Sequence, residues 1–398
     1  MRATRLLAVI TPAAMLLVGC STGEVEEIES HREFKVLGTE EIPKEFISGK
    51  GQRFVLSGPA KFVPDPVGGP EPVSPANGSG ARDTRSEDQM TREELAHALR
   101  PVMLYKDHEY TLDGPAYELA DAIIAARGKE LKTKGSEGRA RVTNDVDITP
   151  GLTRPQGIIG TDTREVKRDN TVFPSSTRVL ITNPTLTFGC SGQMIGPTTI
   201  LTAASCLHDG SGWLPTRSWS PGVDSQDTNP FPYQGGSLYP DPAGDTPTFG
   251  CYTPIVPSEW KNGQISVSHD FAIMELGPMY PGSCDMDPPG DDVGWLGLWV
   301  PSESALEGRS GYIYGYADKG NWPQIWGSHG PLTDEGAEIR HEIDTSSAQK
   351  GAAIYMFDSA DDRYVVGIHK GTVVGAGENH GRRMTSGLHT WIVNHSAL

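Results

Sequence analysis

From residue 158 onward, the sequence consists of short runs of β-branched and aromatic residues that are separated by Gly, Pro and Asp. The runs read RVLITN, TTILTAA, FAIMEL, GYIYGY and RYVVGIH. Short runs of this composition between turn residues are typical of antiparallel strands in a sandwich or a barrel. The chain of 398 residues also holds 47 Gly and 31 Pro, and only 36% of its residues are hydrophobic. We therefore expect a mainly β domain over residues 158–398.

The residues before this domain have a different composition. Residues 64–90 are rich in Pro, Gly and Ser, which is typical of a flexible linker. The acidic, mixed residues that precede the linker show no sustained hydrophobic period. We divide this part of the chain into a signal segment over residues 1–19, an acidic segment with the linker over residues 20–90, and a small, partly helical region that resembles a pro-segment over residues 91–157.

Three helices are predicted outside the β-rich runs. TREELAHALR begins at Thr91, whose side chain can form a capping box with Glu94. PAYELADAIIAARGKE carries an apolar face, and Gly128 marks its end. Near the C-terminus, three apolar residues recur at helical spacing: Leu388, Trp391 and Ile392. This spacing predicts a short terminal helix that packs one face on the domain.

The N-terminus has the pattern of an export signal. It reads MRATRLLAVITPAAMLLVGC, and the apolar run from Leu6 to Val18 is shorter than the about 20 residues that span a bilayer, so it predicts a signal peptide. The run ends in LVGC, which resembles the bacterial lipobox and implies that Cys20 is lipidated. Because Ser21 is not the Asp that retains lipoproteins at the inner membrane, we expect an envelope lipoprotein, at the outer membrane where the cell has one. The lipid anchor is its only expected membrane contact.

Four cysteines remain when Cys20 is set aside: Cys190, Cys206, Cys251 and Cys284. An even number in an exported protein indicates disulfide bonds, and three pairings are possible. We expect the most local pairing, Cys190 with Cys206 and Cys251 with Cys284. The first bond would close a loop of about 15 residues and contribute roughly 3 kcal/mol.

The charge pattern excludes some partners. The net charge of −17 mainly supports solubility and repels anionic surfaces. No basic, aromatic-rich stretch is present, so we expect no nucleic-acid partner. The acidic turns PPGDDVG and DSADDR lack the ligand spacing of a calcium loop. We therefore expect no metal and no cofactor.

A series of motifs stands in the order found in trypsin-like serine proteases, and within them in the bacterial glutamyl endopeptidases. IIGTDTRE (residues 158–165) resembles the mature N-terminus of that branch, and FGCSGQMIGPTTILTAASC (residues 188–206) resembles its Cys-Ser-Gly…Thr-Ala-Ala-His-Cys segment. HDFAIMEL (residues 269–276) resembles the strand of the triad Asp, DTSSAQKGAA (residues 344–353) the nucleophile loop, and VVGIHKG (residues 365–371) a strand of the specificity pocket. The resemblance implies a trypsin/chymotrypsin-like double β-barrel with a C-terminal helix.

The resemblance also assigns the positions of the catalytic triad, and two of them hold other residues. Asp270 stands at the position of the Asp, but Ser205 replaces the His base and Lys350 replaces the Ser nucleophile. Ser cannot accept and return a proton near neutral pH, as the base must. Ala348 replaces the oxyanion-hole Gly, and Gln349 follows it. Because loss of the base or of the nucleophile alone costs on the order of 10⁶ in turnover, the resemblance implies a domain without the family's hydrolytic machinery.

The specificity pocket is better preserved. Thr345 and His369 match the Thr and the His that bind the substrate Glu in glutamyl endopeptidases. A protonated His369 would hold an acidic side chain by charge-assisted hydrogen bonds; the alternative is that His369 is merely packed. Lys370 and the residues after it depart from the small residue and Gly-Gly that usually follow this His, which leaves the shape of the pocket open.

A buried Asp without its His needs another partner. We hypothesise that Lys350 forms an ion pair with Asp270 across the vacant His site, and that Ser205 hydrogen-bonds the same carboxylate. The alternative is that the Lys350 ammonium is solvated.

Three functions remain open. We favour a pseudoprotease that binds an unknown peptide or protein partner in the former substrate cleft. An active hydrolase would need unorthodox residues, for which Ser347 and Lys350, spaced as Ser-x-x-Lys, are the candidates. A structural envelope protein would not use the cleft at all. Because an inactive domain does not need the new N-terminus that cleavage before Ile158 creates, we expect residues 21–157 to stay attached.

Overall fold

The computed structural model describes the following residues: 42–63, 85–105, 107–139, 141–142, 158–159, 161–167, 172–182, 189–215, 218–223, 252–263, 266–276, 287–317, 324–373, 377–396 and 398. Contacts divide the chain into Met1–Ile42 and a compact unit of Pro43–Leu398. The second unit holds nearly all of the described residues. Cys20, Cys251 and Cys284 lie outside the described residues, so the lipidation and the second disulfide stay predictions. Among the described residues, no helix combines the length and hydropathy that a membrane crossing needs.

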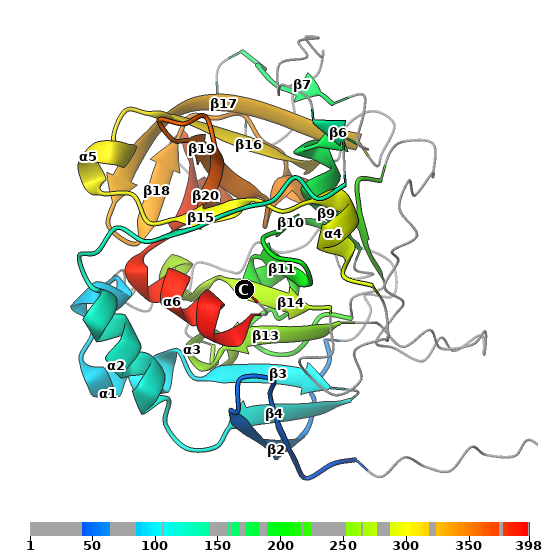
Figure 1. Cartoon of the computed structure of the whole chain (residues 1–398), viewed down its shortest axis with the longest axis vertical. Helices are drawn as coiled ribbons and strands as arrows, with labels where there is room; N and C mark the ends of the chain where they lie inside the picture. The colour runs from blue at the N-terminus through cyan, green and yellow to red at the C-terminus, as the bar shows by residue number, and fades with distance from the viewer. Residues whose placement is uncertain are drawn as a thin grey trace, which may run out of the picture. The chain divides into compact units, whose positions relative to one another are not determined.

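The larger of two main sheets has ten strands, and each strand is antiparallel to its neighbours (Figure 1). In spatial order they are β1 (Glu45–Ile47), β2 (Arg53–Pro59), β4 (His108–Leu112), β3 (Pro101–Tyr105), β13 (Thr253–Pro257), β14 (Ala272–Glu275), β11 (Thr199–Thr202), β10 (Cys190–Met194), β9 (Arg178–Thr182) and β12 (Ser218–Pro221). The first four precede residue 158 in the chain, and the other six follow it.

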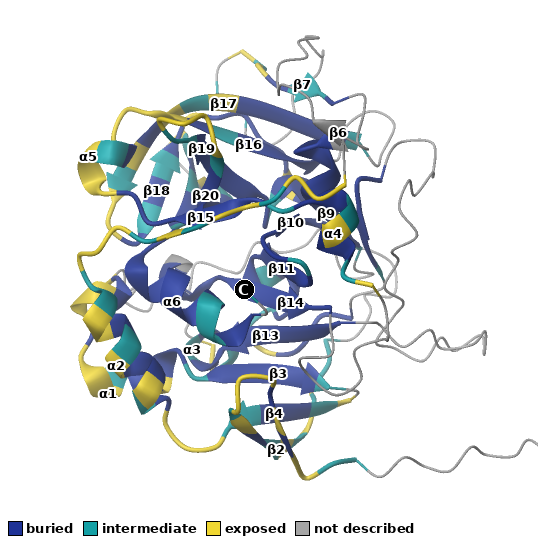
Figure 2. Cartoon of the chain, in the orientation of Figure 1, coloured by how far each residue is buried: buried dark blue, intermediate teal, exposed yellow. Residues whose placement is uncertain are grey.

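The second sheet closes on itself. Its order is β19 (Ala353–Phe357), β16 (Ser310–Ala317), β17 (Gln324–Glu335), β18 (Glu338–His341), β21 (Glu378–Arg383), β20 (Arg363–Val373), β15 (Gly297–Trp299) and β5 (Lys132–Thr133), and β7 (Glu165–Val166) pairs with β17. Because β19 also pairs with β20, the strands from β19 to β20 form a barrel. The strands of this barrel are largely buried (Figure 2). A separate parallel pair joins β6 (Arg141–Val142) to β8 (Val172–Phe173).

The helices are short. They are α1 (Arg92–Ala98), α2 (Tyr117–Ala126), α3 (Ser258–Lys261), α4 (Pro289–Val293), α5 (Glu303–Leu306) and α6 (Ser386–His395), with 3-10 turns η1 (Glu87–Gln89), η2 (Ser175–Thr177), η3 (Ala204–Cys206), η4 (Val267–His269) and η5 (Ser347–Gln349). The predicted helices near residues 91 and 115 and at the C-terminus correspond to α1, α2 and α6. The predicted capping box forms, with the Glu94 N–H donating to Thr91 Oγ1 and the Thr91 N–H to Glu94 Oε2.

The residues before 158 are joined to the body by backbone pairing and by buried charge. β3 pairs with β13, and β5 pairs with β15. Helix α2 packs against α6, as Figure 1 shows with α2 in teal and α6 in red. The Arg382 guanidinium donates to the Glu87 carboxylate, and neither side chain is exposed. The Thr385 hydroxyl donates to the same carboxylate over 2.9 Å.

The structure confirms the expected fold class, which is mainly β with a chymotrypsin-like barrel, antiparallel sheets and a C-terminal helix. It also contains strands that the sequence did not indicate. β1 and β2 lie before the linker, where the residues show no hydrophobic period. They are found at the edge of the ten-stranded sheet, where two of the three residues of β1 and three of the seven residues of β2 are exposed.

Candidate functional site

The first sheet brings two of the three triad positions together. Ser205 lies in η3, directly after β11, and Asp270 lies directly before β14. Because β11 and β14 are antiparallel neighbours with Thr202 opposite Ala272, these positions meet at one edge of the sheet. The Ser205 N–H donates to Asp270 Oδ1 over 2.8 Å. The Ser205 hydroxyl is buried and has no hydrogen-bond partner in the described part of the chain, so the backbone, not the side chain, supports the carboxylate.

The partner of Asp270 is Lys370, from the second sheet. Lys370 lies in β20 at a point where the pairing with β21 shifts between His369 and Gly371. A bulge of this kind redirects a side chain, and the Lys370 ammonium forms an ion pair with Asp270. Its Nζ also lies 5.3 Å from the centre of the Trp260 ring. The hypothesis that Lys350 fills this role is therefore wrong.

The Lys370–Asp270 pair is buried. The two residues are 9% and 3% exposed. Burial lowers the pKa of the Lys370 amine, and the Arg382 guanidinium adds to this effect. The adjacent Asp270 carboxylate opposes both of these effects on the pKa, because it favours the charged form of the amine. The pair therefore occupies the space between Asp270 and the second sheet, where the resemblance places the catalytic His.

The nucleophile loop forms a closed turn rather than an oxyanion hole. The Lys350 N–H, which stands where the nucleophile's oxyanion donor is expected, donates to the Ser347 carbonyl over 3.2 Å and closes η5. The Ala348 carbonyl accepts the Ser191 hydroxyl over 2.9 Å, and the Gln349 amide donates to the Trp326 carbonyl over 2.8 Å. These bonds hold the turn from both sides. One of the two N–H donors that an oxyanion hole needs, that of Lys350, is thus already bonded to a carbonyl of the chain.

Gly351, the one residue of the nucleophile motif that is kept after Lys350, is required by the backbone. Its φ is +84°, and a Cβ there would lie 2.3 Å from the Ser191 carbonyl oxygen and from Thr202 Oγ1. Both neighbours belong to the first sheet, so any larger residue would push the nucleophile loop away from it. The kept glycine therefore reflects packing and says nothing of catalysis.

Lys350 lies where the two sheets meet. Its carbonyl accepts the Ser191 N–H over 2.8 Å and contacts Cys206 Sγ at 3.8 Å, next to Ser205. On the other side, the Gly351 N–H donates to the His369 carbonyl over 2.9 Å. The Lys350 side chain is partly exposed and forms no ion pair with any described residue. Burial lowers the pKa of its amine, and its charge contributes to lowering the pKa of His369.

Three histidines from adjacent strands gather in the barrel: His341 in β18, His369 in β20 and His380 in β21. The rings of His341 and His369 lie 5.4 Å apart. Burial lowers the pKa of His341 to about 3 and the pKa of His369 well below its usual value, and His380 contributes to both shifts. His369 is therefore neutral at pH 7. It is fully buried, and neither ring nitrogen has a hydrogen-bond partner in the described part of the chain.

The segment after Ile158 is bound at the start of the nucleophile loop. Asp344 accepts the Ile159 N–H and the Thr163 N–H, each over 2.7 Å, as well as the Thr163 hydroxyl. The next residue is Thr345, which is 1% exposed and whose carbonyl accepts a bond from Arg164. The first residues of the predicted domain thus bind the start of the loop that carries the pocket position Thr345 and the nucleophile position Lys350.

The predicted disulfide between Cys190 and Cys206 is confirmed. It ties the start of β10 to η3, directly beside Ser205. His208, near this bond, is buried, and its Nδ1 accepts the Gly210 N–H over 3.0 Å. Its carbonyl accepts the Trp260 indole N–H over 2.7 Å, and its ring packs edge-on against Trp213. It therefore has no place in the former triad.

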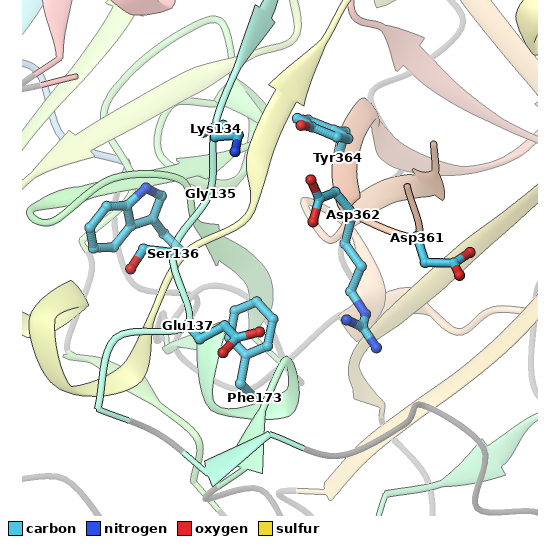
Figure 3. A pocket seen from close by; sticks show the side chains of 10 residues that line it. Lys134, Gly135, Ser136, Glu137, Phe173, Asp361, Asp362 and Tyr364 are labelled. Atoms are coloured by element: carbon cyan, nitrogen blue, oxygen red, sulfur yellow. The ribbon is translucent and has the colours of Figure 1, made fainter. Parts of the chain in front are cut away.

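A separate pocket of about 300 Å³ lies elsewhere, beside β5 and the start of β20 (Figure 3). It is lined by Lys134, Gly135, Ser136, Glu137, Phe173, Trp295, Asp361, Asp362, Arg363 and Tyr364. None of the sequence-predicted site residues lines it. Its charged residues are exposed or half-exposed, and it contains neither a buried unpaired group nor a set of convergent ligands.

The closed barrel, the disulfide beside the base position and the convergence of Ser205, Asp270 and Lys350 define a chymotrypsin-like serine protease fold. The comparisons agree. The glutamyl endopeptidase of Bacillus licheniformis is 25% identical over 238 residues, 58% of this chain and 66% of that protein. A protein of Bacillus subtilis (strain 168) named extracellular metalloprotease is 27% identical over 241 residues, 58% of this chain and 67% of that protein. The chain is a homologue of glutamyl endopeptidases and of trypsin-like serine proteases.

Other comparisons are weaker. Inactive serine protease 35 of Bos taurus is 42% identical over 64 residues, which are 15% of this chain and 14% of that protein. A solved Glu endopeptidase in complex with MPD superposes with a TM-score of 0.46 at 23% identity, covering 59% of this chain and 97% of that one. The match spans about two thirds of the curated Bacillus relatives. No protein-family model matches the chain.

The sequence did not indicate that Lys370 pairs with Asp270, or that His341 and His380 lie beside His369. The signal for Lys370 was its place directly after His369, where the resemblance leads one to expect a small residue. The other two histidines lie on different strands and form no motif, so only the strand order brings them to His369. No group of three or more His, Cys, Asp or Glu in the described part of the chain could hold a metal ion.

Proposed function

We propose that this chain is an exported, lipid-anchored pseudoprotease whose former substrate cleft binds a peptide or protein partner. The observation that carries the proposal is the ion pair between Lys370 and Asp270. It stands where the catalytic base would have to sit. A restored His at position 205 would find its orienting carboxylate already bound, so the packing supports a loss of catalysis in addition to the triad residues.

Binding is favoured over a purely structural role by unpaired polar groups at the positions that the resemblance assigns to the specificity pocket. His369 keeps two unpaired ring nitrogens at 0% exposure, beside a Lys350 that has no acidic partner among the described residues. Buried polar groups in a native fold are normally hydrogen-bonded. Groups left unpaired at this place could be satisfied by a polar ligand. Thr345 and His369 are buried in this structure, so a ligand reaches them only when the residues that cover them move.

The loss of catalysis is tested with the purified protein and a fluorophosphonate probe, together with turnover of Glu-containing peptides. We expect no labelling and no turnover. Labelling that is abolished by Ser347→Ala would support the Ser-x-x-Lys hydrolase instead. Ser347→Ala is a suitable variant because this side chain is exposed, and its loss does not disturb the core.

The cleft is tested by partner capture from the host envelope. Wild-type protein is compared with the double variant Thr345→Ala, His369→Ala, and with Lys134→Met as a control in the separate pocket. We expect the double variant to lose the partner and the control to keep it. Capture that is unchanged in the double variant would remove the cleft from the proposal and favour a structural role.

Export and anchoring are tested by replacing Cys20. We expect wild-type protein in the membrane fraction of a bacterial host, with lipid attached at its N-terminus, and Cys20→Ser protein released from the membrane. Wild-type protein that starts at Ile158 or carries no lipid would contradict the anchored form.

A further inference from the structure

The Lys370 amine and the Asp270 carboxylate are held in contact in the interior of the protein. Their side chains are 6% and 4% exposed, and the contact joins Nζ to Oδ2. Apart from this carboxylate, Nζ meets no hydrogen-bond acceptor in the described part of the chain, and the centre of the Trp260 ring lies 5.3 Å away. An ammonium group carries three donors, so this one is poorly compensated for its burial.

The carboxylate is also held from its other side. Asp270 Oδ1 accepts the Ser205 N–H over 2.8 Å, while Oδ2 faces the amine. Ser205 lies in η3, which the disulfide of Cys206 ties to β10. When a nucleophile adds to a carboxyl carbon, negative charge develops on the oxygen that stays, and a fixed N–H at that oxygen stabilises the tetrahedral state. The Asp270 carboxyl group is therefore arranged to accept an amine at its carbon.

A single reaction would remove both buried charges. Burial lowers the pKa of the Lys370 amine, which favours its neutral and nucleophilic form. Condensation with the carboxyl group gives a neutral amide, and so ends the cost of keeping two ions in the interior. The two groups also react as parts of one molecule, and the effective concentration of well-oriented groups reaches about 10⁵–10⁸ M.

We propose that Lys370 and Asp270 condense to an amide that joins the two sheets covalently. Nζ bonds to the carboxyl carbon of Asp270, and the bond from that carbon to Oδ2 breaks. Of the three protons of the ammonium, two leave with Oδ2 as water and one stays on the amide nitrogen, so no further reactant is needed. Oδ1 becomes the amide oxygen and keeps the Ser205 N–H. The ion pair is the state before this reaction.

Intact mass spectrometry of the full chain tests the reaction. The protein is measured after reduction of its disulfides, first when purified and then after incubation until its mass no longer changes. The comparison is Lys370→Arg, which keeps a cation at this place but presents a guanidinium that stays protonated and does not form the amide. Because both proteins have the same N-terminus, we expect the wild type to lose about 18 Da, one water, and the variant to lose nothing.

Peptide mapping locates the bond. Trypsin should release residues 262–309 joined to residues 364–382, uncut after Lys370, because an acylated lysine is not a cleavage site. Asp270→Asn should lose ammonia instead of water, and so reach the same final mass and the same joined peptide as the wild type. Lys129→Met changes a lysine at an exposed position and is the matched control, which should lose water as the wild type does.

Three results would overturn the inference. The first is a wild-type mass that stays at its full value to the end of the incubation. The second is a loss of water without the joined peptide, because Asp270 can also lose water by closing a ring with the backbone nitrogen of Phe271. The third is a loss of water that persists in Lys370→Arg. None of these results would affect the proposed binding function, because the ion pair alone already fills the position of the base.

Discussion

The Lys370–Asp270 pair makes a quantitative prediction about stability. In Lys370→Met, Asp270 keeps the 2.8 Å bond from the Ser205 N–H but loses its counter-charge, and it is only 3% exposed. Removing one partner of a buried ion pair costs about 3–5 kcal/mol, because the other charge is left unpaired in a poorly polarisable environment. We therefore expect the free energy of unfolding of Lys370→Met to fall by about this amount.

The double variant is the decisive comparison. Asp270→Asn with Lys370→Met removes both charges, and the Asn oxygen can still accept the Ser205 N–H, so its stability should lie within about 1 kcal/mol of the wild type. Urea unfolding, followed by tryptophan fluorescence, gives the four free energies of the cycle. Lys129→Met, at an exposed position, is the control and should change stability by less than about 0.5 kcal/mol. Additive effects in the cycle would refute the pair.

Three further predictions concern the fold. Between pH 7 and pH 5, each of four buried histidines should cost about 2 kcal/mol of stability, because it takes up a proton in the unfolded chain near pH 6.5 but, with burial lowering its pKa to about 3 or 4, not in the fold. The four are His208, His341, His389 and His395. Equal urea midpoints at the two pH values would contradict this. Replacing Cys190 and Cys206 by Ala should lower stability by about 3 kcal/mol in the same assay; no change would show that the bond does not constrain the unfolded chain. A chain cut between residues 142 and 158 should elute as one complex in native buffer, because β3–β13 and β5–β15 pairing and the Glu87–Arg382 pair cross the cut; separation without denaturant would contradict that.

Much of the fold could be predicted from the sequence because its signals are local. Thr91 and Glu94 lie within one turn and form the capping box that their spacing indicates. Cys190 and Cys206 are 16 residues apart and form the most local pairing. The β-rich runs after residue 158 became strands. The edge strands β1 and β2 gave no such signal, because a short strand that is only partly buried needs no regular apolar pattern.

The site was less predictable, because its contacts join distant parts of the chain. The motifs correctly indicated that Ser205 and Asp270 would be neighbours. They led us to expect Lys350 as the partner of Asp270, whereas the partner is Lys370. Lys350 stands at the nucleophile position, and Lys370 directly follows a pocket position. Which of the two lysines reaches Asp270 depends on a bulge in β20 that no spacing rule reveals. The gathering of His341, His369 and His380 likewise depends on the register of three strands.

The buried contact between Glu87 and Arg382 also has a consequence for how the protein is made. Its two residues are 295 positions apart, so the acid leaves the ribosome long before its partner exists. A chain that ends before Arg382 would have to bury the Glu87 carboxylate without a counter-charge, at a cost of about 3–5 kcal/mol. In such a chain the closed position of the N-terminal region is disfavoured, and we expect the open form to be more sensitive to proteases. The contact therefore links closure of the N-terminal region to the presence of the last barrel strand, β21, which carries Arg382.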